Sequence, residues 1–181
     1  MKKNVLFVSS EAVPFIKTGG LADVAGSLPK YFDKEHYDVR VMLPKYLCIP
    51  EKWRSQMKYV THFYMDLAWR SQYVGVLEME YAGVHYYFID NEFYFAGPKP
   101  YGYIHEDIEK FAFFSKAALS AMPLLGFKPD IVHCHDWQTG LVPVYMKERF
   151  HDGEFFRDMK SIMTIHNLKF QGIWDLKKVK D

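Results

Sequence analysis

The sequence predicts an α/β protein with a doubly wound, mostly parallel sheet. Short, nearly continuous apolar runs alternate with segments of helical period, which is typical of parallel strands buried on both faces. Polar segments follow three of these runs, at the strand ends where open α/β sheets bind ligands. An aromatic-rich stretch interrupts the alternation and predicts a β-hairpin-rich insertion.

A βαβ unit is predicted within the first 45 or so residues. Residues 3–9 (KNVLFVS) form a buried strand, and residues 38–43 (DVRVML) form the next strand. Between them, residues 21–32 place apolar side chains at helical spacing. Gly26 and Pro29 weaken or kink that helix.

The middle of the chain predicts three strands, over residues 57–67, 71–81 and 84–90. A short Ala-Gly turn joins the last two, so they form a hairpin.

The rest of the chain returns to the α/β alternation. We predict a helix over residues 106–125, a strand over 130–136, a helix over 137–150 and a last strand over 160–167. No internal repeat or low-complexity segment interrupts the pattern, so residues 1–181 are expected to form a single domain.

The composition and charge of the chain limit the classes of function that it can have. The 181 residues are 49% hydrophobic. The 23 Lys plus Arg nearly balance the 22 Asp plus Glu, so the chain has no large net charge that would favour binding to nucleic acid or to a membrane. Cys48 and Cys134 are too few for a disulfide framework, and neither a signal-like N-terminus nor a long apolar run is found. We therefore expect a cytoplasmic protein, and any anion site must be local.

The loop after the first strand is the first candidate site. Gly19 and Gly20 allow backbone N–H groups to approach an anion at the start of the following helix, and Lys17 adds a mobile cation. The spacing is neither GxGxxG nor a Walker A loop. Taken alone, a helix-initiating turn with a solvated lysine explains the loop equally well.

The HCHD segment ends the next-to-last predicted strand. Strand alternation places His133 and His135 on one face, and Cys134 and Asp136 on the other. A zinc site made of both histidines and a cysteine is disfavoured because it lacks a CxxC or HExxH context. We expect His133 in the core and His135 and Asp136 facing solvent or ligand, although capping of the helix beginning near Trp137 is slightly favoured for Asp136.

His166 and Asn167 end the last strand in the same way. Both side chains can hydrogen-bond to a sugar or a phosphate, although a lone histidine is more often structural. Lys17, Asp136 and His166 should share one rim if the strands are assigned correctly, and this convergence favours a binding site.

Three motifs now carry a resemblance to a known family. The segments are VLFVSSEAVPFIKTGGLADVAGSLP, DIVHCHDWQTGL and IMTIHNLKFQG, and they resemble the N-terminal half of bacterial glycogen synthase and plant starch synthase. The resemblance covers Val5 to Gly172. It implies a Rossmann-like N-terminal domain of a GT-B retaining glycosyltransferase of family 5. Such an enzyme transfers glucose from ADP-glucose to the non-reducing 4-hydroxyl of an α-1,4-glucan such as glycogen.

The resemblance also implies roles for the loop after the first strand. Lys17, Gly19 and Gly20 match residues that face the glucose and diphosphate of the donor. Asp23 matches an aspartate that steadies this loop. A tyrosine of the family approaches the donor as well; Tyr101 is its match, with Tyr103 as a rival.

Two further matches lie at the later strand ends. Asp136 corresponds to an aspartate near the glucose. His166 corresponds to a histidine whose imidazole contacts the 6-hydroxyl and whose carbonyl lies beside the anomeric carbon, and Asn167 accompanies it. Lys17, Asp136 and His166 are the implied catalytic residues.

These implied roles agree with the chemistry of retaining transfer. Cleavage of a glucosyl phosphate bond builds positive charge at C1 and negative charge on the leaving diphosphate. A lysine and a helix N-terminus suit the leaving group, and a fixed carbonyl suits the cation. We expect no metal and no cofactor.

A GT-B enzyme needs a second, nucleotide-binding domain, which the resemblance places after this chain. We therefore expect the chain alone to be inactive. A non-catalytic carbohydrate- or sugar-phosphate-binding module is the alternative. A nucleotide-dependent oxidoreductase is disfavoured because GxGxxG is absent and no acidic residue ends the second strand.

The aromatic stretch leaves two interpretations open. Its side chains either stack on the sugar rings of a glucan or form the core of the hairpin. The core is favoured. The residues concerned are Trp53, Phe63, Tyr64, Trp69 and Tyr73.

Overall fold

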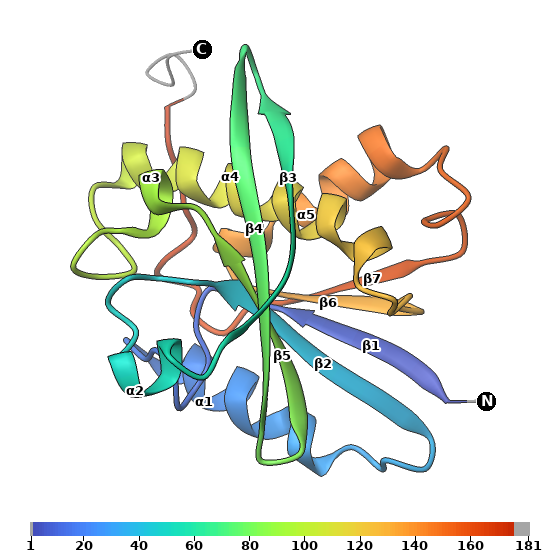
Figure 1. Ribbon diagram of the computed structural model, residues 1–181. Helices are drawn as coiled ribbons and strands as arrows, with labels where there is room; N and C mark the ends of the chain where they lie inside the picture. Colours follow the sequence, from blue (N-terminus) through green and yellow to red (C-terminus); the bar gives the residue numbers. More distant parts are fainter. Residues whose placement is uncertain (1, 176–181) are drawn as a thin grey trace.

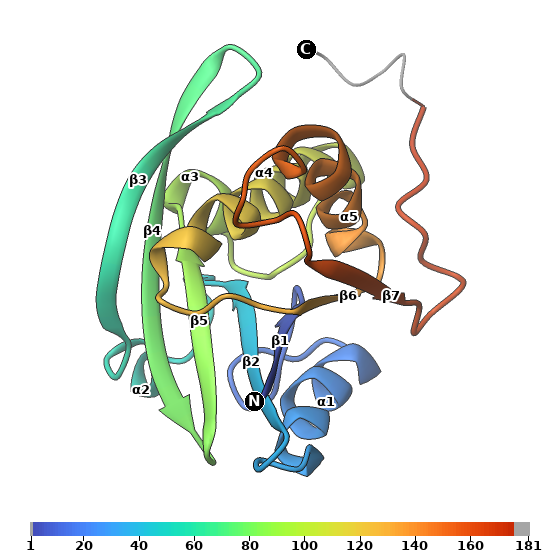
Figure 2. The ribbon, with the colours of Figure 1, turned by 90° about the vertical axis from the view of Figure 1, so that its right-hand side faces the viewer.

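The computed structural model describes residues 2–175 and shows one sheet with helices on both faces (Figure 1). Helix α1 covers one face, and α4 and α5 cover the other (Figures 1 and 2). The strands are β1 (Lys3–Val8), β2 (Tyr37–Pro44), β3 (Lys58–Leu67), β4 (Arg70–Tyr81), β5 (Val84–Asp90), β6 (Ile131–His135) and β7 (Lys160–Thr164). The α-helices are α1 (Gly20–Ser27), α2 (Glu51–Arg54), α3 (Glu92–Phe95), α4 (Ile104–Ala121) and α5 (Leu141–Tyr145).

The strand order within the described residues is β3-β4-β5-β2-β1-β6-β7. Strands β5, β2, β1, β6 and β7 are parallel to one another, whereas β4 is antiparallel to both of its neighbours, β5 and β3. Chain order reverses between β1 and β6, which is the position where doubly wound sheets bind ligands. The predicted fold class is therefore confirmed.

The hairpin-rich part extends the main sheet. Strand β5 pairs with β4 through the predicted hairpin and with β2 in the parallel block. Ala82 and Gly83 form the turn with φ of 50° and 73°, as a two-residue hairpin turn of the primed type requires. The β3–β4 ribbon continues past the helices that cover the sheet (Figure 1).

The aromatic side chains of this region divide between core and surface. Trp53 and Phe63 pack against the core, as the favoured interpretation predicts. Tyr64 and Trp69 are 70% and 78% exposed, and Tyr73 is 37% exposed, so the core interpretation is wrong for these three residues.

Helix α1 is shorter than predicted. It ends at Ser27, and a 3₁₀ helix (η1, Leu28–Tyr31) follows with Pro29 near its start. Gly26 has a packing role, because a Cβ there would lie 2.2 Å from the carbonyl oxygen of Val13. The helix therefore packs closely against the loop that precedes it.

The predicted helix over residues 137–150 is broken into three pieces. A 3₁₀ helix (η3, Trp137–Thr139) comes first, then α5, then a π-helical turn (η4, Met146–Phe150). Pro143 has no N–H for the carbonyl of Thr139, so α-helical bonding cannot run without interruption from Trp137. Helix α4 keeps nearly its predicted length and ends in a 3₁₀ turn (η2, Met122–Leu124).

Candidate functional site

The loop between β1 and α1 lies at the carboxyl end of β1, the middle strand of the parallel block. Gly19 is the N-cap residue of α1 and has extended backbone angles, with no side chain to cap the helix. A Cβ at Gly19 or Gly20 would meet no atom within 4 Å. Packing within the protein therefore does not require glycine at these positions. Glycine instead leaves the surface over the first turn of the helix open, so that a ligand can approach the backbone N–H groups.

Glu11 holds this loop in place. Its side chain is buried, and its carboxylate accepts hydrogen bonds from the backbone N–H of Thr18, from the Thr18 hydroxyl at 2.8 Å and from the Tyr101 hydroxyl at 2.6 Å. Hydrogen bonds to a charged acceptor are stronger than neutral ones. One carboxylate thus joins the loop after β1 to the segment that precedes α4.

Tyr101, not Tyr103, points into this site. The hydroxyl of Tyr101 also forms a hydrogen bond with the Ser10 hydroxyl, at 2.8 Å. Tyr103, in contrast, is 72% exposed. Burial, followed by the nearby charge of Glu11, raises the pKa of Tyr101. The phenol therefore stays protonated and donates to the carboxylate.

The end of β6 differs from the prediction in two respects. His135 is fully buried, so the expectation that it meets solvent or ligand is wrong. The ring of Phe7 packs against the ring of His135, with centroids 4.8 Å apart. The capping interpretation of Asp136 is also wrong. Its side chain makes no cap hydrogen bond in η3 and instead accepts one from the backbone N–H of His166 at 2.7 Å.

Asp136 adopts a φ of 57°, which is rare for a residue other than glycine. Such conformations cost about 1–3 kcal/mol and persist where the surroundings enforce them, often at functional sites. Here the backbone N–H of Asp136 donates to the carbonyl of Thr164 at 2.9 Å, and the Thr139 hydroxyl donates to the carbonyl of Asp136 at 3.2 Å. The ends of β6 and β7 are thereby joined through Asp136.

The histidines of β6 follow the predicted alternation. The rings of His133 and His135 stack at 4.2 Å on the same face, while Cys134 is buried between its neighbours. His133 is only partly buried, and its Nε2 lies 2.7 Å from the Thr164 hydroxyl. Within residues 2–175, no three His, Cys, Asp or Glu side chains gather so as to hold a metal ion.

One cavity of about 940 Å³ brings most of the candidate residues together. It lies where the ends of β1, β6 and β7 meet the start of α1. The candidate residues that line it are Gly19, Gly20, Tyr101, Asp136, His166 and Asn167.

Lys17 and Asp23 do not line this cavity. The ammonium group of Lys17 lies 2.7 Å from a carboxylate oxygen of Asp23, and both side chains are 52% exposed. Asp23 thus contacts the glycine loop through Lys17. An exposed pair of this kind has little stabilising effect, so the lysine can exchange this partner for a ligand.

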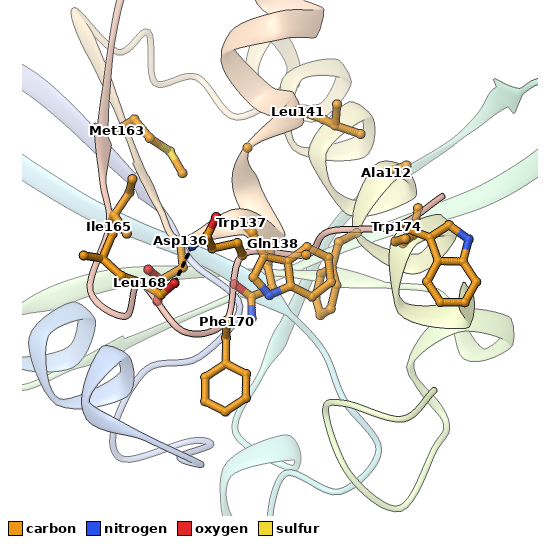
Figure 3. Close-up of a pocket in the computed structure, with 15 residues that line it drawn as sticks. Ala112, Asp136, Trp137, Gln138, Leu141, Met163, Ile165, Leu168, Phe170 and Trp174 are labelled. Carbon is orange, nitrogen blue, oxygen red and sulfur yellow. Dashed lines mark hydrogen bonds between the residues drawn. The ribbon is translucent and has the colours of Figure 1, made fainter. Parts of the chain in front are cut away.

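A second cavity of about 570 Å³ adjoins the first and shares residues 136–138 and 170–172 with it. Figure 3 shows Trp137 and Gln138 in its middle, with Phe170 and Leu168 on one side and Trp174 on another. Its wall is mostly apolar. The polar contacts for a charged ligand are therefore concentrated in the larger cavity.

Sequence reasoning missed several residues of the larger cavity. Glu11, Asp107, Gln138 and Lys169 all line it, and the first three are buried. The Oε1 atom of Gln138 has no hydrogen-bond partner among the described residues. An acidic residue inside an otherwise apolar segment after a strand was the available signal for Glu11.

This fold and this cavity define a class: doubly wound α/β domains with a ligand-sized cavity at the reversal of strand order. The family described as "Starch synthase catalytic domain" matches residues 4–181. The chain belongs to this family.

Curated proteins of similar sequence agree with this family assignment. The chain is 78% identical over 179 residues to the glycogen synthase of Lachnospira eligens, covering 99% of this chain and 37% of that protein. It is 49% identical to the glycogen synthase of Anoxybacillus flavithermus over 170 residues, covering 94% of this chain and 35% of the relative. The chain thus spans little more than a third of the curated relatives it matches.

A solved structure gives the same result. The catalytic domain of starch synthase IV from Arabidopsis thaliana, bound to ADP and acarbose, matches with a TM-score of 0.80 at 27% identity. The match covers 95% of this chain and 35% of that chain. In addition, none of the helices described between residues 2 and 175 is long and apolar enough to cross a membrane.

Proposed function

We propose that this chain forms the N-terminal, acceptor-side part of a cytoplasmic glycogen synthase. Such an enzyme transfers glucose from ADP-glucose to the 4-hydroxyl of an α-1,4-glucan with retention of configuration. The observation that carries the proposal is the convergence of the glycine loop, Asp136 and His166 on one cavity at the reversal of strand order. ADP and acarbose in the Arabidopsis structure support the choice of donor and acceptor.

The proposed division of labour follows the charges of the reaction. The open first turn of α1 and Lys17 stabilise the departing diphosphate. The backbone carbonyl of His166 and the carboxylate of Asp136 lie toward the sugar, where positive charge develops at C1. Asp136 also binds the main chain of His166, so the two groups keep a fixed separation.

To test the proposal, this chain is fused to the remaining two thirds of the Lachnospira eligens relative, which gives a completed enzyme. We expect ADP-glucose-dependent extension of maltooligosaccharides in this completed enzyme. Lys17→Ala should lower kcat/KM by about a hundredfold, because it removes a cation from the leaving group. Lys3→Ala is the matched control, since Lys3 also forms an exposed ion pair, with Asp130, at the opposite end of β1.

The alternative of a non-catalytic carbohydrate-binding module predicts a different outcome. Oligosaccharide binding without turnover in the completed protein would support that alternative. Equal kcat/KM values in the Lys17→Ala and Lys3→Ala enzymes would refute the role of Lys17 at the leaving group.

A further inference from the structure

A buried histidine lies directly behind the histidine that lines the cavity. The ring planes of His135 and His166 are nearly parallel, at 13°, with centroids 5.2 Å apart. His135 Nδ1 lies 2.9 Å from His166 Nε2. Since ring N–H groups and lone pairs lie in the ring plane, this arrangement is a hydrogen bond between two imidazoles.

The other nitrogen of His135 decides which ring donates. His135 Nε2 is buried and has no hydrogen-bond partner among the described residues. The surroundings also keep this ring neutral: burial, followed by repulsion from His133 and His166, lowers the pKa of His135 to about 3. Near neutral pH, His135 therefore carries one ring proton.

That proton has two possible positions. On Nε2 it would be a buried donor without an acceptor, which is rare and costly in folded proteins. On Nδ1 it is donated to His166, and Nε2 is left as an unpaired acceptor, which is tolerated more often. The second arrangement is favoured, and it makes His166 Nε2 the acceptor.

We propose that His135 is a positioning residue that fixes His166 in its Nδ1–H tautomer. His166 then presents a hydrogen-bond donor to the cavity, and the ligand atom opposite it must be an acceptor such as a hydroxyl or phosphate oxygen. Asp136, the next residue of the chain, holds the backbone N–H of His166. The end of β6 thus fixes both the ring and the main chain of His166. The tautomer stands on this geometry, and its use in glucosyl transfer rests on the proposed function.

The first experiment measures the tautomer in the 181-residue chain. We label histidine with ¹⁵N and record ring nitrogen shifts at about pH 8.5, two units above the ordinary pKa of histidine. We expect the proton of His166 on Nδ1 and that of His135 also on Nδ1. A His166 proton located mainly on Nε2 would overturn the proposal without any mutation.

Variants separate positioning from simple packing. His135→Phe keeps the volume of the side chain but removes the hydrogen bond, so both tautomers of His166 should appear. His135→Asn keeps an N–H near the place of Nδ1 and should restore the Nδ1–H form. His133→Phe is the matched control, because His133 stacks on His135 but bonds to Thr164; the tautomer should not change. An unchanged tautomer in His135→Phe would overturn the proposal.

The completed enzyme then tests the use of the tautomer. We expect His135→Phe to lower kcat/KM about tenfold, the effect of one hydrogen bond, with recovery in His135→Asn and no loss in His133→Phe. Loss in His135→Asn equal to that in His135→Phe would contradict the proposal. An inactive completed wild-type enzyme would refute the proposed function and leave the tautomer measurement unaffected.

Discussion

Glu11 is the residue on which the geometry of the glycine loop depends most directly. It is 2% exposed and accepts hydrogen bonds from Thr18 and Tyr101. Glu11→Gln keeps the shape but removes the negative charge and replaces one acceptor oxygen by an NH₂ group, which cannot accept a hydrogen bond. We expect the free energy of unfolding to fall by about 2 kcal/mol, measured by urea denaturation of the 181-residue chain.

Glu35→Gln is the control for this change, because Glu35 is exposed and surface substitutions usually stay within about 0.5 kcal/mol. Equal unfolding free energies in the two variants would show that Glu11 does not hold the loop. In the completed enzyme, Glu11→Gln should also weaken donor binding, since the loop carries Gly19 and Gly20.

The sequence allowed the cavity-lining residues at strand ends to be predicted, because their position follows from the strand pattern. Gly19, Asp136 and His166 were found in this way. Glu11 was missed because its partners come from the distant Tyr101 segment. His135 was misplaced because alternation gives the face of a strand but not what covers that face.

Strand β6 makes stability depend on pH. Burial lowers the pKa of His135 to about 3, and burial also lowers the pKa of its neighbour His133. Between about pH 6.5 and pH 3 the unfolded chain therefore binds more protons than the folded chain. The contribution of His135 is complete above about pH 6.5 and is lost as the pH falls through this window.

We expect His135→Phe to reduce the dependence of the unfolding free energy on pH. One proton corresponds to about 1.4 kcal/mol per pH unit, so the slope between pH 6 and pH 4.5 should fall by roughly that amount. Urea denaturation across this range measures it. His151→Gln, which removes an exposed imidazole, is the control; the same slope in wild type and His135→Phe would contradict burial of a neutral ring.

At the level of elements, long periodic segments were predictable and short ones were not. The strands and α4 were found near their observed bounds. Helices α2 and α3 have four residues each, too few to show a period. The helix over residues 137–150 has a continuous helical pattern, but Pro143 interrupts the bonding that the pattern assumes.

At the level of the whole molecule, the parallel block could be predicted but its extension could not. Right-handed βαβ units and the reversal of chain order follow from the alternation of strands and helices. Nothing in the aromatic stretch specifies that β5 pairs with β2, because that pairing is non-local. The hairpin therefore looked like an insertion, although it continues the sheet.

The charges needed for the transfer and the length of the chain lead to the last prediction. Retaining glucosyl transfer requires stabilisation of both the sugar cation and the leaving diphosphate. In this chain Lys17, the cation proposed to stabilise the diphosphate, pairs with Asp23 in an exposed position. The chain also spans 37% of its Lachnospira eligens relative. We therefore expect no ADP-glucose-dependent glucan extension by the purified 181-residue chain, and strong extension by the completed enzyme.

The two proteins are compared by incorporation of labelled glucose into maltooligosaccharides at equal concentration. The isolated Lys17→Ala chain sets the background, because it lacks the proposed leaving-group cation and keeps the fold. Extension by the isolated wild-type chain above that background would show that the remaining two thirds of the relative are not needed to complete the cleft. Extension at background level, with activity in the completed enzyme, would instead show that this part is needed for glucan extension.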